Sequence, residues 1–233
     1  MEQKISYNEI LWLILILANF SLTLVAFRLW GKLGLFLFAV LSIILANVQA
    51  LKQVQLFGLN GSMGDISYIG VYLISDIVSE NYGKETARKI IWLGMFSVFA
   101  TTVIMYLSLQ LIPSSYDQAQ NSLLNIFGFF PRLVVASLCA FAISQSYDIF
   151  AYQFWRKRFP SFAQIWIRNG MSTLVSQLID NAIFTIIAFS GVFPMSYMLQ
   201  IFITSCVLRT IISVLDTPFV YWSVAIKNKV IEV

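Results

Sequence analysis

Residues 166–190 have the sequence WIRNGMSTLVSQLIDNAIFTIIAFS, and this stretch decides the fold class. It is long enough to cross a hydrocarbon layer of ~30 Å, which needs about 20 mainly apolar residues in a helix. Its polar residues recur at helical spacing and share one face: Asn169, Ser172, Thr173, Ser176, Gln177 and Asp180. An ionised acid at bilayer depth costs roughly 2.5–3.5 kcal/mol on insertion scales, so such a residue usually faces a cavity or a partner. The stretch predicts a membrane-spanning helix with one functional face.

The rest of the chain has the same character. Its 233 residues are 59% hydrophobic and 11% charged, whereas a soluble domain carries about 25% charged residues. We therefore predict an all-α, polytopic membrane protein with six core spans and one extra N-terminal span. Residues 1–32 form the extra span with a basic loop, and residues 33–233 form the core. The predicted spans are 9–27, 33–51, 66–80, 88–112, 131–153, 166–190 and 196–226.

The basic residues predict the orientation. With the N-terminus outside and the C-terminus in the cytoplasm, eleven lysine and arginine residues fall on the cytoplasmic side and three on the other. That is the positive-inside pattern. The formal charge of +4 is too small to indicate nucleic-acid binding. We expect no metal and no cofactor, since the chain has no histidine and its two cysteines, Cys139 and Cys206, lie in apolar segments where they suit packing.

Two other spans repeat the pattern of a carboxylate among polar or aromatic neighbours. At helical spacing the third carries Tyr68, Tyr72, Asp76 and Glu80, and the fifth carries Phe141, Gln145, Asp148 and Tyr152. Such a stripe suits a planar, hydrogen-bonding ligand. The alternative for the fifth and sixth spans is helix-to-helix hydrogen bonding and close packing. For Glu80 the alternative is an ion pair with Lys84 or Arg88 at the cytoplasmic edge.

The seventh span carries Arg209 and Asp216 two turns apart. Because arginine does not lose its proton, Arg209 needs a counter-charge, for which Asp180 and Asp148 are the candidates. We predict that Glu80, Arg209 and Asp216 act in gating or in structure. Pro218 should kink this helix or end its straight part. In the second span, the small pair Ala46-x3-Ala50 predicts close helix packing, within this chain or in a homodimer.

Several motifs resemble those of a known family. Residues 75–84 (SDIVSENYGK), 148–160 (DIFAYQFWRKRFP), 166–180 and 215–219 (LDTPF) occur in the family's order. Together they resemble the queuosine precursor transporter family, formerly described as vitamin uptake transporters. Gly170 departs from the asparagine expected after Asn169. The first span looks like the N-terminal addition of longer family members.

The resemblance implies a transporter and not an enzyme. Its substrates would be 7-deazaguanine bases that feed queuosine modification of tRNA: 7-cyano-7-deazaguanine, 7-aminomethyl-7-deazaguanine or queuine. It would be a multi-pass protein of the bacterial plasma (inner) membrane. Its partners would be the small-molecule base and the lipid bilayer, with no nucleic acid. The resemblance leaves open whether the protein forms a homodimer. It also leaves open whether transport is driven by protons, by sodium or by the substrate gradient alone.

We predict a substrate site at mid-depth among the third, fifth, sixth and seventh spans. A carboxylate can accept both N1–H and the 2-amino group of a guanine-like base, and an amide NH2 can donate to O6. A tyrosine could stack on the bicycle. The predicted substrate-binding residues are Tyr72, Asp76, Gln145, Asp148, Asn169, Gln177 and Asp180.

Two other functions compete with this prediction. A substrate-binding subunit of an energy-coupling-factor-type vitamin transporter would depend on a separate ATPase, and this chain has no nucleotide-binding loop. An intramembrane aspartyl protease would need a Gly-x-Gly-Asp element. The nearest run, Ser62-Met63-Gly64-Asp65, lacks the first glycine and lies in a predicted loop.

Overall fold

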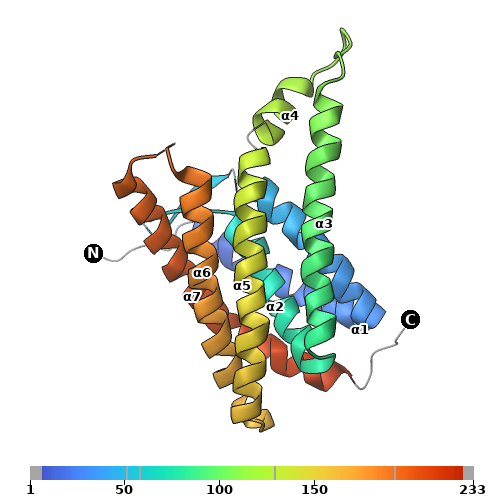
Figure 1. Cartoon of the computed structure of the whole chain (residues 1–233), viewed down its shortest axis with the longest axis vertical. Coiled ribbons are helices and arrows are strands. Elements are labelled where there is room, and N and C mark those ends of the chain that lie inside the picture. The colour runs from blue at the N-terminus through green and yellow to red at the C-terminus, as the bar shows by residue number, and fades with distance from the viewer. Residues whose placement is uncertain (1–6, 51, 58, 129, 192, 228–233) are drawn as a thin grey trace.

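The computed structural model describes residues 7–227 apart from residues 51, 58, 129 and 192, and it leaves the side chains of some further residues undescribed, Asn169 among them. The main chain is mostly helical (Figure 1). In chain order the described elements are α1 (Tyr7–Gln49), β1 (Gln53–Leu56), β2 (Leu59–Ser62), α2 (Gly64–Asn81), α3 (Lys84–Leu109), α4 (Gln120–Phe127), α5 (Phe130–Arg158), the 3-10 turn η1 (Phe162–Gln164), α6 (Ile165–Phe189) and α7 (Met195–Lys227).

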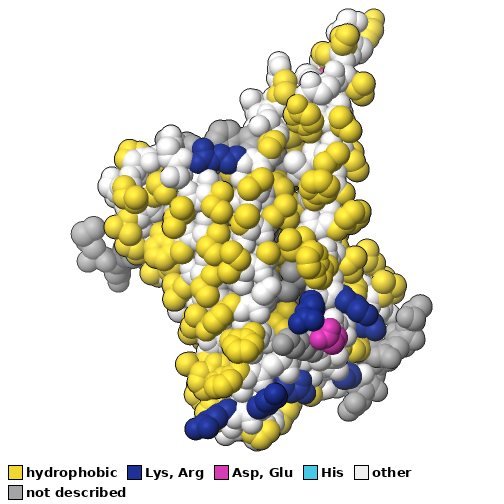
Figure 2. Space-filling view, viewed as in Figure 1, with side chains coloured by type: hydrophobic (Ala, Val, Ile, Leu, Met, Phe, Trp, Pro, Cys, Tyr) yellow, Lys and Arg dark blue, Asp and Glu magenta, His cyan; other side chains and the backbone are white. Residues whose placement is uncertain are grey.

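The helices have the length and composition of a membrane protein. Five described stretches are long and apolar enough to cross a membrane: Tyr7–Gln49, Glu85–Leu109, Gln120–Arg158, Phe162–Phe189 and Met195–Lys227. Large hydrophobic side chains cover much of the visible face, and lysine and arginine side chains gather at its lower end (Figure 2). The prediction of an all-α membrane protein is confirmed in this form.

The first two predicted spans are the two arms of α1. With 43 residues, α1 would be about 65 Å long if straight, twice the hydrocarbon thickness. It bends at Gly31, whose φ of 57° and ψ of −135° are not helical and favour glycine. The bend brings Gly34 against Ala26, because a Cβ on Gly34 would lie 2.1 Å from the Ala26 carbonyl oxygen. In a straight helix those residues would be about 12 Å apart along the axis.

The run after α1 forms a β-hairpin, whereas the sequence predicted only a loop here. β1 and β2 pair antiparallel, with Gln53 opposite Ser62. The hairpin tip is tied to the first arm of α1, since the Phe57 N–H donates to Glu9 Oε1 at 2.9 Å. Among the described residues, this hairpin holds all the β-strands, and it connects the second arm of α1 to α2.

Helix α2 is the central element. Every residue from 70 to 79 is buried, and α1, α3, α5 and α7 all pack against it. Its start packs closely against α1, because a Cβ on Gly64 would lie 2.5 Å from the carbonyl oxygen of Ala46 and 2.9 Å from Ala50 Cα. The close packing predicted for Ala46-x3-Ala50 is confirmed within this chain. A helix enclosed on all sides can carry polar residues without exposing them to lipid.

The remaining helices follow the predicted spans within a few residues. α5 and α6 pack together along their length, and α3 runs beside α5 (Figure 1). The predicted loop 113–130 contains the short helix α4. Helix α7 continues past Pro218 to Lys227, so the proline does not end it. We call the end of the molecule that holds the last turn of α5 and the first turn of α3 the basic end, since Arg88, Lys89 and residues 156–158 lie there. The opposite end is the hairpin end.

Candidate functional site

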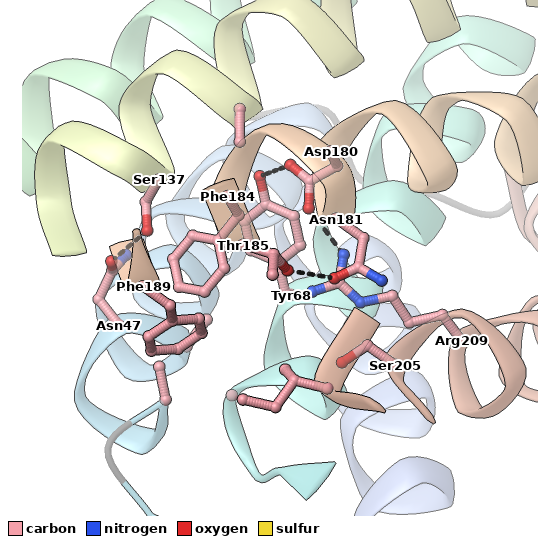
Figure 3. Close-up of a pocket in the computed structure, with 15 residues that line it drawn as sticks. Asn47, Tyr68, Ser137, Asp180, Asn181, Phe184, Thr185, Phe189, Ser205 and Arg209 are labelled. Atoms are coloured by element: carbon pink, nitrogen blue, oxygen red, sulfur yellow. Dashed lines mark hydrogen bonds and ion pairs between the residues drawn. The ribbon is translucent and has the colours of Figure 1, made fainter. Parts of the chain in front are cut away.

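A cavity of about 50 Å³ lies toward the hairpin end (Figure 3). It is bounded by the end of α1, the start of α2 and of α5, the end of α6 and the first half of α7. Apolar walls surround a few polar side chains: Asn47, Tyr68, Ser137, Asp180, Asn181, Thr185, Ser205 and Arg209. With about 10–15 Å³ needed for each water, the cavity has room for roughly three to five waters. Apolar walls with few convergent polar groups are typical of small-molecule sites.

Asp180 is bonded to three other helices in this cavity. Its Oδ2 accepts from Arg209 NH1 at 2.7 Å, and the two side chains are only 3% and 7% exposed. Its Oδ1 accepts from the Tyr68 hydroxyl at 2.8 Å and from Ser144 Oγ at 3.2 Å. The guanidinium of Arg209 also lies over the Tyr68 ring, 5.4 Å from its centroid. Asp180 is therefore the counter-charge of Arg209, one of the two predicted candidates.

A second polar layer lies deeper, between α2, α5 and α6. Asp148 accepts from Ser176 Oγ at 2.7 Å, and its carboxyl group interacts with that of Asp76. The amide nitrogens of Gln145 and Gln177 have no hydrogen-bond partner among the described residues, although these side chains are 1% and 4% exposed. A buried donor without a partner costs about 1–3 kcal/mol, so native structures seldom keep one without a use.

A third layer lies at the basic end. Glu80 Oε1 accepts from Arg168 NH2 at 2.8 Å, and Glu80 Oε2 accepts from the Tyr152 hydroxyl at 2.8 Å. The alternative of an ion pair between Glu80 and Arg88 is not observed, because Arg88 lies beside Glu85 at 3.4 Å. The side chain of Lys84, the other alternative partner, lies outside the described residues. Glu80 points inward to α6, while Arg88 and Glu85 face outward on α3.

The three layers form one continuous set. Tyr68 and Glu80 are twelve residues apart on α2, and so are Arg168 and Asp180 on α6, which corresponds to about 18 Å along each helix. We call the buried polar residues between these two levels on α2, α5 and α6 the polar column. Its upper end opens into the cavity, and its lower end meets the Glu80–Arg168 pair.

Comparisons with known proteins identify the family of the chain. The family model described as "Putative vitamin uptake transporter" matches residues 62–223. A protein of Bacillus subtilis (strain 168) called "Probable queuosine precursor transporter" is 38% identical over 215 residues, covering 92% of this chain and 94% of its own. The chain belongs to this family. A "Queuosine precursor transporter" of Escherichia coli (strain K12) is 26% identical over 153 residues, covering 66% of each chain. No solved structure matches the chain.

In this member of the vitamin uptake transporter family, the predicted site residues divide between the cavity and the column. Among the described residues of the predicted set, Asp180 and Arg209 line the cavity. Asp76, Gln145, Asp148 and Gln177 lie below it, all at most 4% exposed. Tyr72 is also buried and donates to Ser144 Oγ at 3.2 Å. Asp216 is buried on α7 and does not line the cavity. The side chain of Asn169 lies outside the described residues.

Sequence reasoning missed several residues of the site. Arg168 was counted only as a positive charge near the cytoplasm, yet it is 2% exposed and pairs with Glu80. Ser144 links Tyr72 to Asp180, and Asn181 and Thr185 line the cavity. The sequence held one clue to them, because three of these residues directly neighbour a predicted site residue in the chain: Ser144, Arg168 and Asn181. Their partners lie on other helices and could not be seen in a single span.

Proposed function

We propose that this chain imports queuosine precursors, the 7-deazaguanine bases 7-cyano-7-deazaguanine, 7-aminomethyl-7-deazaguanine or queuine, across the bacterial plasma (inner) membrane. It acts as a transporter and not as an enzyme. The names of the relatives from Bacillus subtilis and Escherichia coli support the substrate class. The main observation that supports the proposed binding site is the buried polar column. In it, the amide donors of Gln145 and Gln177 lack partners in the described structure.

In the proposed topology the chain crosses the membrane seven times, with the N-terminus outside and the C-terminus in the cytoplasm. The two arms of α1 supply the first two spans, and α2, α3, α5, α6 and α7 supply the other five. Residues 1–32 contain the extra span and residues 33–233 the six-span core. The sharp bend at Gly31 supports two spans in α1. The gathering of basic residues at one end supports placing that end in the cytoplasm.

The polar column offers what a guanine-like base requires. Asp148 or Asp76 can accept N1–H and the 2-amino group together, as charge-assisted hydrogen bonds. The unpartnered NH2 groups of Gln145 and Gln177 can donate to acceptor atoms such as O6. Ligand binding would thereby satisfy donors that are otherwise buried without a partner.

Entry would proceed from the hairpin end. A base would first meet the cavity, where Asp180 can bind its donors and Tyr68 can contact its ring. It would then move down the column toward Asp148. Tyr72 and Asn169 complete the proposed substrate-binding set, Tyr72 lying one helical turn below Tyr68. Glu80, Arg209 and Asp216 are assigned to gating or structure in this scheme.

The test is uptake of labelled base by cells that cannot synthesise queuosine precursors, scored by queuosine in their tRNA. We expect Asp148→Asn and Gln177→Leu to reduce uptake at least tenfold at equal expression, since each removes a proposed substrate contact. Gln200→Leu makes the same chemical change on an exposed position of α7 and should leave uptake unchanged. Normal uptake by both column variants would refute the site.

A second experiment separates this function from a binding subunit that depends on an ATPase. The purified chain, reconstituted alone into liposomes, should accumulate or exchange labelled base without ATP. The experiment works equally for a monomer and for a homodimer. Transport only after a separate ATPase module is added would identify the chain as a substrate-binding subunit.

A further inference from the structure

The basic end of the polar column is closed by a single buried arginine. Arg168, on the first turn of α6, is 2% exposed and is the largest fully buried side chain described. Its NH2 donates to Glu80 on α2 at 2.8 Å, and its NH1 donates to the carbonyl oxygens of Phe159 at 2.9 Å and Ser161 at 3.3 Å. One guanidinium thus ties the end of α2 and the α5–α6 connection to the start of α6.

Helix α5 is tied to the same place by two further contacts. The Tyr152 hydroxyl donates to the second oxygen of Glu80 at 2.8 Å, and Arg156 NH1 donates to the Ser79 carbonyl oxygen at 2.9 Å. The three helices that line the column therefore converge on Glu80 and Ser79. Any solute leaving the column toward the basic end must separate these contacts.

At the opposite end Asp180 is also bonded to Tyr68, Ser144 and Arg209, but Tyr68, Asp180 and Arg209 line an open space there and do not fill the end of the column. There the column ends at Asp180, in a cavity bounded by five helices (Figure 3). The two ends are about 18 Å apart along α2 and α6, more than half the hydrocarbon thickness. A cavity at one end and a closed network at the other is the arrangement expected of a transporter that faces one side of its membrane.

We infer that Arg168, with Glu80 and Tyr152, forms the cytoplasmic gate of this transporter, closed in this structure and opened for release of the base. The inference rests on the proposed transport function and orientation. Two features favour a gate over a permanent brace. Arg168 Nε has no partner among the described residues, so the guanidinium is incompletely satisfied where it lies. Glu80 is 11% exposed at its side chain, so water reaches the edge of the pair and can hydrate both charges when they part.

The experiment measures access to the column from each side of the membrane without using a substrate. Cys139 and Cys206 are replaced by alanine and serine, and Ser176→Cys is introduced as a reporter two turns from Arg168 on α6. A membrane-impermeant thiol reagent is then applied to right-side-out or inside-out vesicles. With the gate intact, labelling from the cytoplasmic side should be slow.

Weakening the gate should raise cytoplasmic labelling. We expect a rise of roughly tenfold or more for Glu80→Gln and Arg168→Gln, the scale of one hydrogen bond to a charged group, and a smaller rise for Tyr152→Phe. Arg168→Lys should fall between wild type and Arg168→Gln, because lysine keeps the charge but cannot reach three acceptors in a planar fork. Arg88→Gln is the matched control: its ion pair with Glu85 is 53% and 77% exposed at the same end of the molecule, and its loss should change nothing.

The outcomes separate the gate from the substrate assignment. If Arg168→Gln does not accumulate as a folded protein, Tyr152→Phe, which removes one hydrogen bond, answers the question. Unchanged cytoplasmic labelling in folded Glu80→Gln and Tyr152→Phe would overturn the gate and make the network a static brace. A labelling increase, combined with failure of the wild-type chain to take up 7-deazaguanine bases, would support the gate while refuting the substrate.

Discussion

The ion pair between Arg209 and Asp180 gives the sharpest quantitative prediction. Its charged atoms are 2.7 Å apart, and the side chains are 7% and 3% exposed. Removing one partner leaves the other charge buried, which costs about 3–5 kcal/mol. We therefore expect Arg209→Met and Asp180→Asn each to lower the free energy of unfolding by that amount. The double variant has no buried charge at this position, so it should lose much less, about 1–2 kcal/mol.

Equilibrium unfolding in mixed SDS and detergent micelles, followed by circular dichroism, measures all four proteins of this cycle. The expected coupling free energy is at least about 4 kcal/mol, well above the ~0.6 kcal/mol average of hydrogen bonds between membrane helices. A double variant that loses the sum of the two single losses would refute the pairing. Uptake adds a second readout. If the double variant is stable but does not transport, at least one of the two charges serves transport. If transport returns with stability, the pair serves only structure.

Three further predictions concern the scaffold. Gly34→Ala should prevent accumulation of folded protein, because its Cβ would lie 2.1 Å from a backbone oxygen. Gly170→Ala should be tolerated, because its Cβ would meet nothing within 4 Å. Size-exclusion chromatography distinguishes the folded from the aggregated variant. Arg132→Gln should lower the free energy of unfolding by about 0.5–1 kcal/mol without reducing uptake. The reason is that Arg132 donates to the Ile187 carbonyl oxygen at 3.1 Å and to that of Ser190 at the end of α6. A normal melting temperature would contradict this. Cys139→Ala with Cys206→Ser should retain uptake, since serine still accepts the hydrogen bond that Asn181 donates to Cys206; loss of uptake in the folded variant would show a role beyond packing.

The extent of the helices was predictable from the sequence because it depends on local composition. Apolar runs placed most helix ends within a few residues of their observed positions, and the spacing of Tyr68, Tyr72, Asp76 and Glu80 predicted one inward stripe. The hairpin and the partner of Glu80 were not predictable in this way. Both depend on contacts between segments distant in the chain, such as Glu80 with Arg168, eighty-eight residues later.

The sequence by itself determined that acids lie in an apolar chain and must face inward, because lipid does not solvate a carboxylate. It also restricted the counter-charge of Arg209 to two aspartates. Only the tertiary structure selected Asp180 and divided the predicted residues between a cavity and a deeper column. It also placed Arg168 across the exit of that column. The physical reason is that hydrophobicity acts on each segment separately, whereas ion pairs and hydrogen bonds form only at about 3 Å and depend on how the helices pack.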